Sequence, residues 1–483
     1  MDLSGLDRRR LMRWGAAAAL TGAGSSIFAQ TTSARATGSR RRTVILGAGM
    51  AGLAAGLELK QAGHEVIVLE GQMRPGGRVH TLRAPFSDGL HAEAGAGRIP
   101  STHHLTLSYI ERYKLTLDPF FPQSGSKVFL WRGARQVTPF GAGPDIATLK
   151  VDFNAADRAV GFNGLQAKYL GDVLAKIESL PQDAWPLPPL APLGDIGMAD
   201  YLRAKGASPD VVATLCGGFE TDSVLDFVHD AVSHAAPMLS KIRGGNDLLP
   251  YAMAAELSDV IHYGAKVVRI AHDADGVSIT CETPTGRHEL RADRAICTLP
   301  YTVLRDIEVA PGWSETKGRA VRGLYMGPVA RVFVQTDGRF WEADGRNGFA
   351  TVDQPMEIWS PTFREPGRRG ILMSYIYENL AVAYSGLSEG DQVARTLSLF
   401  ERIHPGLRDH VEGTATWSWL NHPWSKGAYA VIRPQDYQTV VPHLATPEGL
   451  IHFAGEHTSP WTGWIQGALH SGLRAAREVQ IAP

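Results

Sequence analysis

The chain has 483 residues, enough for about three domains, and its net charge is −1, from 48 Lys plus Arg against 49 Asp plus Glu. That balance argues against a nucleic-acid partner, because nucleic-acid-binding proteins usually carry a basic excess or stripe. Three cysteines are too few for a disulfide scaffold or a cysteine-rich metal site, so we expect no metal. No stretch of about 18 apolar residues follows residue 36, so we expect no stable membrane anchor.

Residues 1–36 have the features of an export signal. The twin-arginine pattern around Arg8 and Arg9 precedes a mildly apolar stretch over 14–20. Small residues follow that fit cleavage after Ala36, with Ala29 as the alternative site. A disordered basic tail is the alternative. Because twin-arginine export carries folded proteins, we expect a periplasmic or secreted protein that receives its cofactor before export.

A dinucleotide-binding βαβ unit opens the chain after this leader. The apolar run 43–46 predicts a buried strand, the glycine-rich segment 47–52 follows it, and 53–62 predicts a helix. A second strand over 65–69 ends at Glu70, which is placed to accept hydrogen bonds from ribose hydroxyls. Gly47 permits the tight turn, Gly49 allows backbone N–H groups to approach a pyrophosphate, and Gly52 allows close helix–strand packing.

A second glycine pair follows in residues 74–81, Arg-Pro-Gly-Gly-Arg-Val-His-Thr. Here the chain resembles the flavin amine oxidase superfamily, which carries R-x-G-G-R-x-x-S/T after the ribose-binding acid. Gly77 lets the loop pass close to a diphosphate, and Arg78 can neutralise it. Two glycine-rich elements around one acid favour FAD over NAD.

The resemblance extends to the C-terminus. Residues 449–456 predict a strand that ends in Gly455-Glu456, the superfamily's late FAD motif, and a helix begins near 463 and runs to about 479. In a middle strand, Val267 matches the position whose main chain faces adenine, with core packing as an equal alternative. The FAD-binding residues that the resemblance implies are Gly47, Gly49, Met50, Ala51, Gly52, Glu70, Gly77, Arg78, Gly95, Ala96, Gly97, Arg98, Val267, Gly455, Glu456, Gly463, Trp464 and Ile465.

One arginine favours an amino acid as the substrate. Residues 95–100, Gly-Ala-Gly-Arg-Ile-Pro, resemble the G-x-x-R-I-P segment of the L-amino-acid oxidase branch, whose Arg pairs with the substrate carboxylate. Monoamine and polyamine oxidases lack it, because their substrates have no carboxylate. A charge-assisted pair of this kind is worth roughly 1.5–3 kcal/mol. The alternative for Arg98 is a contact to the flavin phosphates.

A predicted strand over 370–377 supports this interpretation. Alternation places Met373, Tyr375 and Tyr377 on one face. The resemblance implies that the Tyr375 hydroxyl binds the same carboxylate and that Tyr377 lines the side-chain pocket, although aromatic residues at this spacing are as often core. It also implies that the Gly463-Trp464 pair walls the substrate amine, with Trp464 aligning that amine for catalysis.

Two positions depart from the superfamily pattern. Ala428 stands where monoamine oxidases carry the Cys that is joined to the flavin, so we expect FAD to be non-covalent. Arg331 stands where the family has a catalytic Lys that assists the reaction with oxygen. Either Arg331 performs that role, or oxygen is a poorer acceptor here, or Arg331 is an ordinary strand residue.

We therefore expect an α/β fold with a discontinuous Rossmann-like FAD domain over 41–98, 240–312 and 443–483. A mixed-sheet substrate domain is expected over 99–135 and 313–440, and a helical insertion over 140–235. The expected reaction is FAD-dependent oxidation of an L-amino acid by O2 to a 2-oxo acid, ammonia and hydrogen peroxide. The alternatives are a monoamine or polyamine oxidase and an amino-acid dehydrogenase with another acceptor. The oligomeric state stays open, with a homodimer as one alternative.

Overall fold

The computed structural model describes residues 40–139, 141–178, 180 and 188–482. The expected export signal over 1–36 lies outside these residues. The described chain forms two compact units. The first contains Arg78–Leu248 and Leu324–Gln438, and the second contains 40–77, Leu249–Gly323 and 439–482. Segments 78–98 and 240–248, expected in the FAD domain, are grouped with the first unit, and 313–323 with the second.

The second unit contains the predicted dinucleotide-binding sheet. All its neighbouring strands are parallel, and its central strand is buried from Val44 to Leu46 because helices cover both faces of such a sheet. The strand order is β10 (Ile261–Tyr263), β2 (Glu65–Glu70), β1 (Arg42–Leu46), β14 (Arg294–Cys297) and β23 (Ile451–Phe453). The predicted strands over 43–46, 65–69 and near the C-terminus are therefore confirmed.

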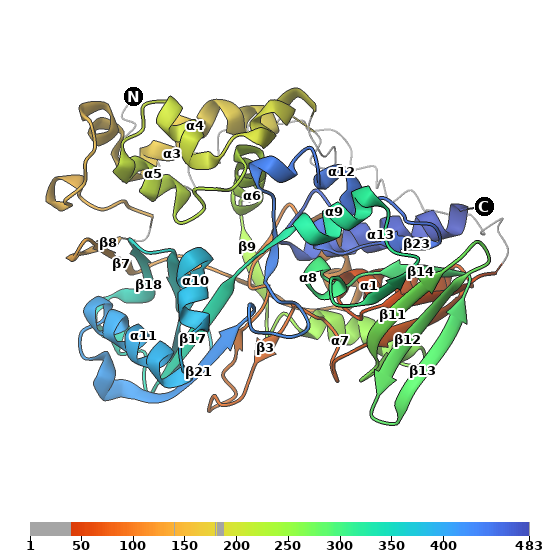
Figure 1. The fold of residues 1–483 in the computed structure, drawn as a ribbon. Coiled ribbons are helices and arrows are strands. Elements are labelled where there is room, and N and C mark those ends of the chain that lie inside the picture. The colour runs from red at the N-terminus through yellow and green to blue at the C-terminus, as the bar shows by residue number, and fades with distance from the viewer. Residues whose placement is uncertain (1–39, 140, 179, 181–187, 483) are drawn as a thin grey trace, which may run out of the picture. The chain divides into compact units, whose positions relative to one another are not determined.

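Two helices of this unit, α1 (Met50–Gln61) and α13 (Ile465–Ile481), pack closely against each other. A Cβ atom on Gly472 would lie 2.2 Å from the Ala51 carbonyl oxygen, so only glycine permits this approach. Figure 1 shows both helices beside the parallel sheet. A second sheet has the order β13 (Gly286–Ala292), β12 (Val277–Thr283), β11 (Lys266–His272) and β15 (Glu308–Ala310).

The first unit is built on a seven-stranded mixed sheet. Its order is β21 (Val411–Ser418), β17 (Val329–Thr336), β20 (Gly370–Tyr377), β19 (Met356–Trp359), β18 (Arg346–Val352), β7 (Ser126–Trp131) and β8 (Ala134–Pro139). Because side chains alternate along a strand, the sheet buries two different cores. Helices α10 (Glu378–Ser385) and α11 (Glu389–Ile403) cover one face (Figure 1), and the other face carries the predicted aromatic residues.

Helices and short strands complete the first unit. The segment expected to be a helical insertion carries α3 (Ala155–Glu178), α4 (Met198–Ala204), α5 (Pro209–Cys216) and α6 (Val224–His234). A small sheet has the order β5 (Ile99–Pro100), β9 (Leu239–Ile242) and β6 (Leu117–Pro119). Two further pairs are β3 (Thr81–Leu82) with β4 (Ala92–Glu93), and β16 (Tyr325–Gly327) with β22 (Tyr429–Val431).

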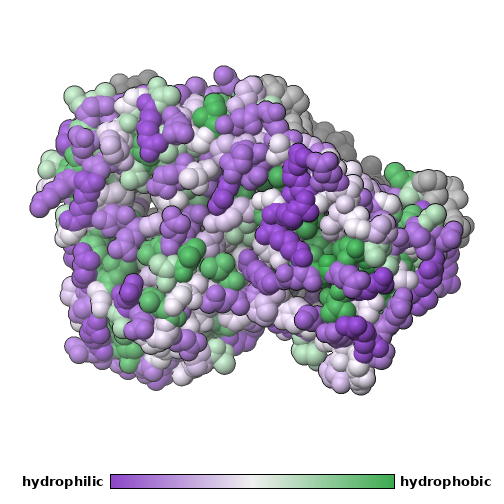
Figure 2. Space-filling view, in the orientation of Figure 1, coloured by the Kyte–Doolittle hydropathy of each residue, from purple (hydrophilic) through white to green (hydrophobic). Residues whose placement is uncertain are grey.

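The surface is mixed in character. On the face drawn in Figure 2, hydrophobic residues form small patches between hydrophilic ones. Within the described part of the chain, no helix has both the length and the apolar character needed to span a bilayer. The three cysteines are buried and unpaired.

Candidate active site

Strand register brings a row of functional side chains together on the aromatic face of the seven-stranded sheet. Tyr375 on β20 lies opposite Arg331 on β17 and opposite Glu357 on β19. Arg331 also lies opposite Trp417 on β21. Because residues directly opposite each other share a face, these four side chains form one continuous row across the sheet. The predicted shared face of Met373, Tyr375 and Tyr377 is confirmed, since all three belong to one buried cluster.

Arg98 reaches this row from the loop between β4 and β5. Its guanidinium carbon lies 4.9 Å from the Trp359 ring, 5.8 Å from Phe120 and 5.9 Å from Tyr375. Its Nη1 donates to Glu357 at 3.2 Å, and the Arg98 side chain is 14% exposed. Burial disfavours the charge, but Glu357 and then Tyr375 raise the pKa of Arg98 above its ordinary value. Arg98 is therefore a cation held among three aromatic rings.

Half of the Arg98 guanidinium forms no hydrogen bond with the part of the chain that the structure describes. Both of its hydrogen bonds run from Nη1 to Glu357, and neither Nε nor Nη2 bonds to any described residue. A carboxylate binds an arginine best through two parallel N–H···O bonds on one edge of the fork. The Nε–Nη2 edge of Arg98 is available for such a pair.

Arg331 is the more deeply buried cation. It is 4% exposed, and its guanidinium carbon lies 4.7 Å from the Tyr375 ring. Its Nη1 donates to the Glu93 carbonyl oxygen, while Nε is buried without a hydrogen-bond partner in the described chain. Burial lowers the pKa of Arg331 to about 10. The role in oxygen chemistry that the resemblance implies for Arg331 stays a prediction.

The two predicted tyrosines contact different partners. The Tyr375 hydroxyl donates to the Tyr429 hydroxyl at 3.3 Å, and burial raises the pKa of Tyr375, so its hydroxyl keeps its proton. Tyr377 stacks on Phe219 with ring centroids 4.8 Å apart. Phe219 belongs to the helical segment, so Tyr377 lies where that segment meets the sheet.

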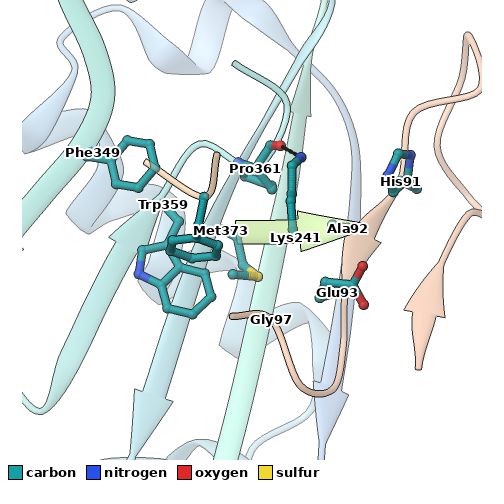
Figure 3. Close-up of a pocket in the computed structure, with 10 residues that line it drawn as sticks. His91, Ala92, Glu93, Gly97, Lys241, Phe349, Trp359, Pro361 and Met373 are labelled. Carbon is teal, nitrogen blue, oxygen red and sulfur yellow. Dashed lines mark hydrogen bonds between the residues drawn. The ribbon is translucent and has the colours of Figure 1, made fainter. Parts of the chain in front are cut away.

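A small pocket shares two rings with the surroundings of Arg98, because Trp359 and Phe120, which lie against the Arg98 guanidinium, also line the pocket. Lys241 reaches into its lining from β9 and donates to the Pro361 carbonyl oxygen at 2.5 Å (Figure 3). Burial lowers the pKa of Lys241. The residues that line the pocket are His91, Ala92, Glu93, Gly97, Phe120, Lys241, Phe349, Trp359, Pro361 and Met373.

Glu93 in this lining is a buried acid. Its carboxyl group accepts hydrogen bonds from the Asn246 backbone N–H at 2.8 Å and from the Thr81 hydroxyl at 2.9 Å. Burial raises the pKa of Glu93 from 4.5 to about 7 despite these bonds.

The substitution Glu93→Gln is expected to remove a pH dependence of stability. An unfolded glutamate loses its proton near pH 4.5, whereas folded Glu93 keeps it up to about pH 7. The folded state therefore binds more protons between these values, and stability falls by about 3 kcal/mol as pH rises through that window. Melting temperatures at several pH values from about 5 to 8 test this. The melting temperature of the variant should rise relative to that of the wild type as pH increases. Parallel plots of melting temperature against pH for the two proteins would show that Glu93 titrates normally.

The predicted glycines of the second unit have the geometry of a diphosphate loop. Gly47 has φ +105°, a conformation that L side chains rarely adopt, and a Cβ atom on Gly52 would lie 1.9 Å from the Gly47 carbonyl oxygen. A Cβ atom on Gly49 would meet nothing within 4 Å, so space lies open above this turn. Helix α1 has no side-chain N-cap and no acid in its first turn, so Met50, Ala51 and Gly52 begin a helix suited to an anion.

Glu70 and the second glycine loop flank this turn. The buried Glu70 carboxylate accepts from the Ala48 and Gln72 backbone N–H groups, both at 2.8 Å. Burial raises the pKa of Glu70. The Gly76 N–H donates to the Ala48 carbonyl oxygen at 2.9 Å, and Gly77 has φ +57°. These residues fit the diphosphate and ribose of a dinucleotide, whose flavin form would supply two-electron redox chemistry.

The C-terminal motif, from Gly455 to Trp464, leads into the N-terminus of helix α13. Glu456 accepts from the Gly463 N–H at 2.7 Å, and Gly455 donates to the Ser471 hydroxyl at 2.9 Å. Trp464 is the N-terminal flanking residue of α13, whose first residue is Ile465. These residues belong to the second unit, as does Val267, which is buried in β11.

The remaining predicted residues lie in the first unit. Segment 94–96 packs on segment 78–80, and a Cβ atom on Gly95 would lie 2.0 Å from the Arg78 carbonyl oxygen. Asn246 donates to the Ala96 carbonyl oxygen, and Gly97 lines the pocket described above. Arg78 Nη1 donates to the Ala428 carbonyl oxygen at 3.0 Å. Their predicted contacts to a cofactor stay predictions.

Several residues of the site were not predicted from the sequence. They are Glu93, Phe120, Lys241, Glu357, Trp359 and Tyr429. The Glu-x-Trp alternation of β19 was an available signal, and the lysine of β9, whose sequence is Leu-Ser-Lys-Ile, was a weaker one.

The fold, the glycine-rich turn with Glu70 and the row of side chains beside Arg98 fit a flavin-dependent oxidoreductase. The sequence profile described as flavin containing amine oxidoreductase matches residues 50–186 and 198–480, and the chain belongs to this family.

Named relatives and a solved structure are similar to most of the chain. The Bacillus subtilis protein YobN is 31% identical, over 92% of this chain and 95% of its own length. The flavin-dependent L-tryptophan oxidase RebO of Lentzea aerocolonigenes is 30% identical, over 91% of this chain and 98% of its own length. Wild-type putrescine oxidase bound to putrescine has the same fold, with a TM-score of 0.76 and 22% identity, over 91% of this chain and 99% of that chain.

Proposed function

We propose that the protein oxidises L-amino acids with a non-covalently bound FAD. An L-amino acid, O2 and water would give a 2-oxo acid, ammonia and hydrogen peroxide. The observation that carries this proposal is the Nε–Nη2 edge of Arg98, which forms no hydrogen bond with the described residues. An amine without a carboxylate has nothing to place at this edge. Bound FAD would supply the two-electron acceptor.

The protein residues have separate tasks in this reaction. Arg98 binds the substrate carboxylate and thereby fixes the position of the α-carbon. Tyr375 holds its proton and can donate to the same carboxylate. Trp359 and Phe120 exclude water around Arg98, which strengthens the ion pair and favours the neutral, reactive form of the amine. No strong side-chain base is required. The amine-aligning role of Gly463 and Trp464 stays part of the proposal.

Matched substrates test the substrate class. L-leucine and 3-methylbutylamine differ only in the carboxylate, as do L-phenylalanine and 2-phenylethylamine. We expect kcat/KM to be at least 100-fold higher for each amino acid, from a carboxylate pair worth about 3 kcal/mol. A preference for the amines would favour the monoamine or polyamine oxidase alternative, which the fold of putrescine oxidase also allows.

The electron acceptor is tested separately. We propose O2, although Arg331 in place of the family lysine leaves an amino-acid dehydrogenase as the alternative. Equal rates of amino-acid loss and peroxide formation would support O2. Turnover that needs an added dye and yields little peroxide would identify a dehydrogenase.

The flavin is expected to leave the protein on denaturation. Ala428 carries no nucleophile, so no bond to the polypeptide can form at that position. After unfolding in guanidinium chloride and ultrafiltration, the yellow chromophore should pass the membrane and identify as FAD by mass. Flavin retained with the polypeptide would contradict non-covalent binding.

We also propose export by the twin-arginine pathway to the periplasm or medium. The support is the Arg8-Arg9 pattern and the apolar stretch behind it. Replacing both arginines by lysine should abolish accumulation outside the cytoplasm, and unchanged accumulation would refute the proposal.

A further inference from the structure

Two cations, the partly buried Arg98 and the buried Arg331, lie on the aromatic face, and of the two only Arg98 forms an ion pair with a carboxylate there. The guanidinium carbons of Arg98 and Arg331 lie 5.9 and 4.7 Å from the same Tyr375 ring. Glu357 bonds to Arg98, and in the described chain no carboxylate forms an ion pair with Arg331. With Glu357 ionised, these three groups leave one positive charge unbalanced.

The other nearby acids are engaged elsewhere. The Glu93 carboxyl group acts on Arg331 electrostatically, but its hydrogen bonds run to Thr81 and Asn246 and to neither guanidinium. Because burial raises the pKa of Glu93 to about 7, this group is mostly neutral below that pH and leaves the balance to Glu357. Asp230 acts on Arg98 from farther away and pairs with His234 at 3.0 Å. The balance of charge beside Arg98 is therefore set mainly by Glu357.

One incoming carboxylate would complete this balance. A buried charge is strongly disfavoured unless it is paired, and Arg331 Nε is already buried with no hydrogen-bond partner among the residues that the structure describes. A substrate with one carboxylate brings the two cations and two anions to neutrality. A substrate with a second carboxylate in its side chain adds an unpaired negative charge beside the partly buried Glu357.

We propose that Glu357 is a specificity-determining residue that restricts the site to substrates with one carboxylate. Its carboxylate occupies Nη1 of Arg98 and leaves only the Nε–Nη2 edge for a ligand. L-aspartate and L-glutamate are thereby excluded, and neutral L-amino acids are accepted. This inference rests on the proposed function, because it assumes that Arg98 binds the substrate carboxylate.

The variant Glu357→Gln removes the charge and keeps the shape. Glutamine retains an oxygen that can accept from Arg98 and from Trp359 Nε1, which now donates to Glu357 at 2.8 Å. The readout is the ratio of kcat/KM for L-glutamate over L-glutamine, and for L-aspartate over L-asparagine. Each pair is nearly isosteric, so a general loss of activity cancels in the ratio.

We expect both ratios to rise at least tenfold in Glu357→Gln. The matched control is Glu282→Gln, which removes an exposed carboxylate paired with Arg287 on a sheet of the other unit and should leave the ratios unchanged. Ratios within threefold of wild type in Glu357→Gln, with neutral amino acids still oxidised by the wild type, would overturn the inference and leave the proposed function standing. A wild type that oxidises only carboxylate-free amines would overturn both.

A binding measurement needs neither turnover nor a variant. Butyrate and succinate are four-carbon acids with one and two carboxylates, and neither can be oxidised as an amine. Calorimetry on the flavin-loaded wild type should give at least tenfold tighter binding of butyrate. Tighter binding of succinate by the wild type would overturn the inference, even if Glu357→Gln did not fold.

Discussion

Arg98→Ala is expected to lower kcat/KM for L-amino acids by 100-fold or more. The change removes the fork that pairs with the carboxylate and leaves Glu357 without its cation. Truncating one partner of a buried, hydrogen-bonded charge pair costs about 2–5 kcal/mol, and 100-fold corresponds to about 2.7 kcal/mol. Steady-state kinetics with L-leucine and L-phenylalanine measure the loss.

Two controls accompany this variant. Arg98→Lys keeps the charge but loses the two-pronged geometry, so its activity should lie between those of wild type and Arg98→Ala. Any activity on 3-methylbutylamine should change by less than threefold in Arg98→Ala, because that amine has no carboxylate to lose. A loss smaller than tenfold on amino acids, about 1.4 kcal/mol, would mean that Arg98 does not bind the carboxylate.

Gly52→Ala is expected to disrupt the dinucleotide-binding unit. The new Cβ atom would lie 1.9 Å from the Gly47 carbonyl oxygen, and a backbone atom cannot move aside by changing a rotamer. Helix α1 must shift away from its turn, at a cost of about 3 kcal/mol. For a unit of this size that corresponds to a melting temperature roughly 10 °C lower. The purified variant should also contain little flavin.

Gly49→Ala separates packing from cofactor binding. Its Cβ atom meets nothing within 4 Å, and Gly49 has φ −72°, which alanine adopts readily. The flavin-free variant should melt within about 2 °C of flavin-free wild type. Its methyl group would project toward the diphosphate, so its affinity for FAD should fall at least tenfold. Equal flavin content in Gly49→Ala and in wild type would contradict the assignment of this turn to the diphosphate.

Local patterns predicted much of the fold. The βαβ segment is predicted within one to three residues at its boundaries, because the apolar runs, the glycines and Glu70 act on residues close in sequence. Alternation along 370–377 correctly placed Tyr375 and Tyr377 on one face. The predicted cluster of Arg98 with Tyr375 is also present.

The partners of Arg98 could not be predicted in the same way. Glu357 meets Arg98 only because β19 pairs with β20 in the register that sets Glu357 opposite Tyr375. Register between strands is a property of the whole sheet, and a shift by one residue would turn Glu357 to the other face. The hydrogen bond from Arg331 Nη1 depends likewise on the Glu93 carbonyl oxygen, which lies 238 positions away in the chain. Neither feature has a local sequence signature.

A crystal structure of the flavin-loaded enzyme with 4-methylpentanoate tests the central claim most directly. This ligand has the carbon skeleton of leucine without the amine, so it binds without reacting. We predict that its two carboxylate oxygens accept hydrogen bonds from Nε and Nη2 of Arg98. A carboxylate bound elsewhere, with the Arg98 guanidinium turned into bulk water, would contradict the account.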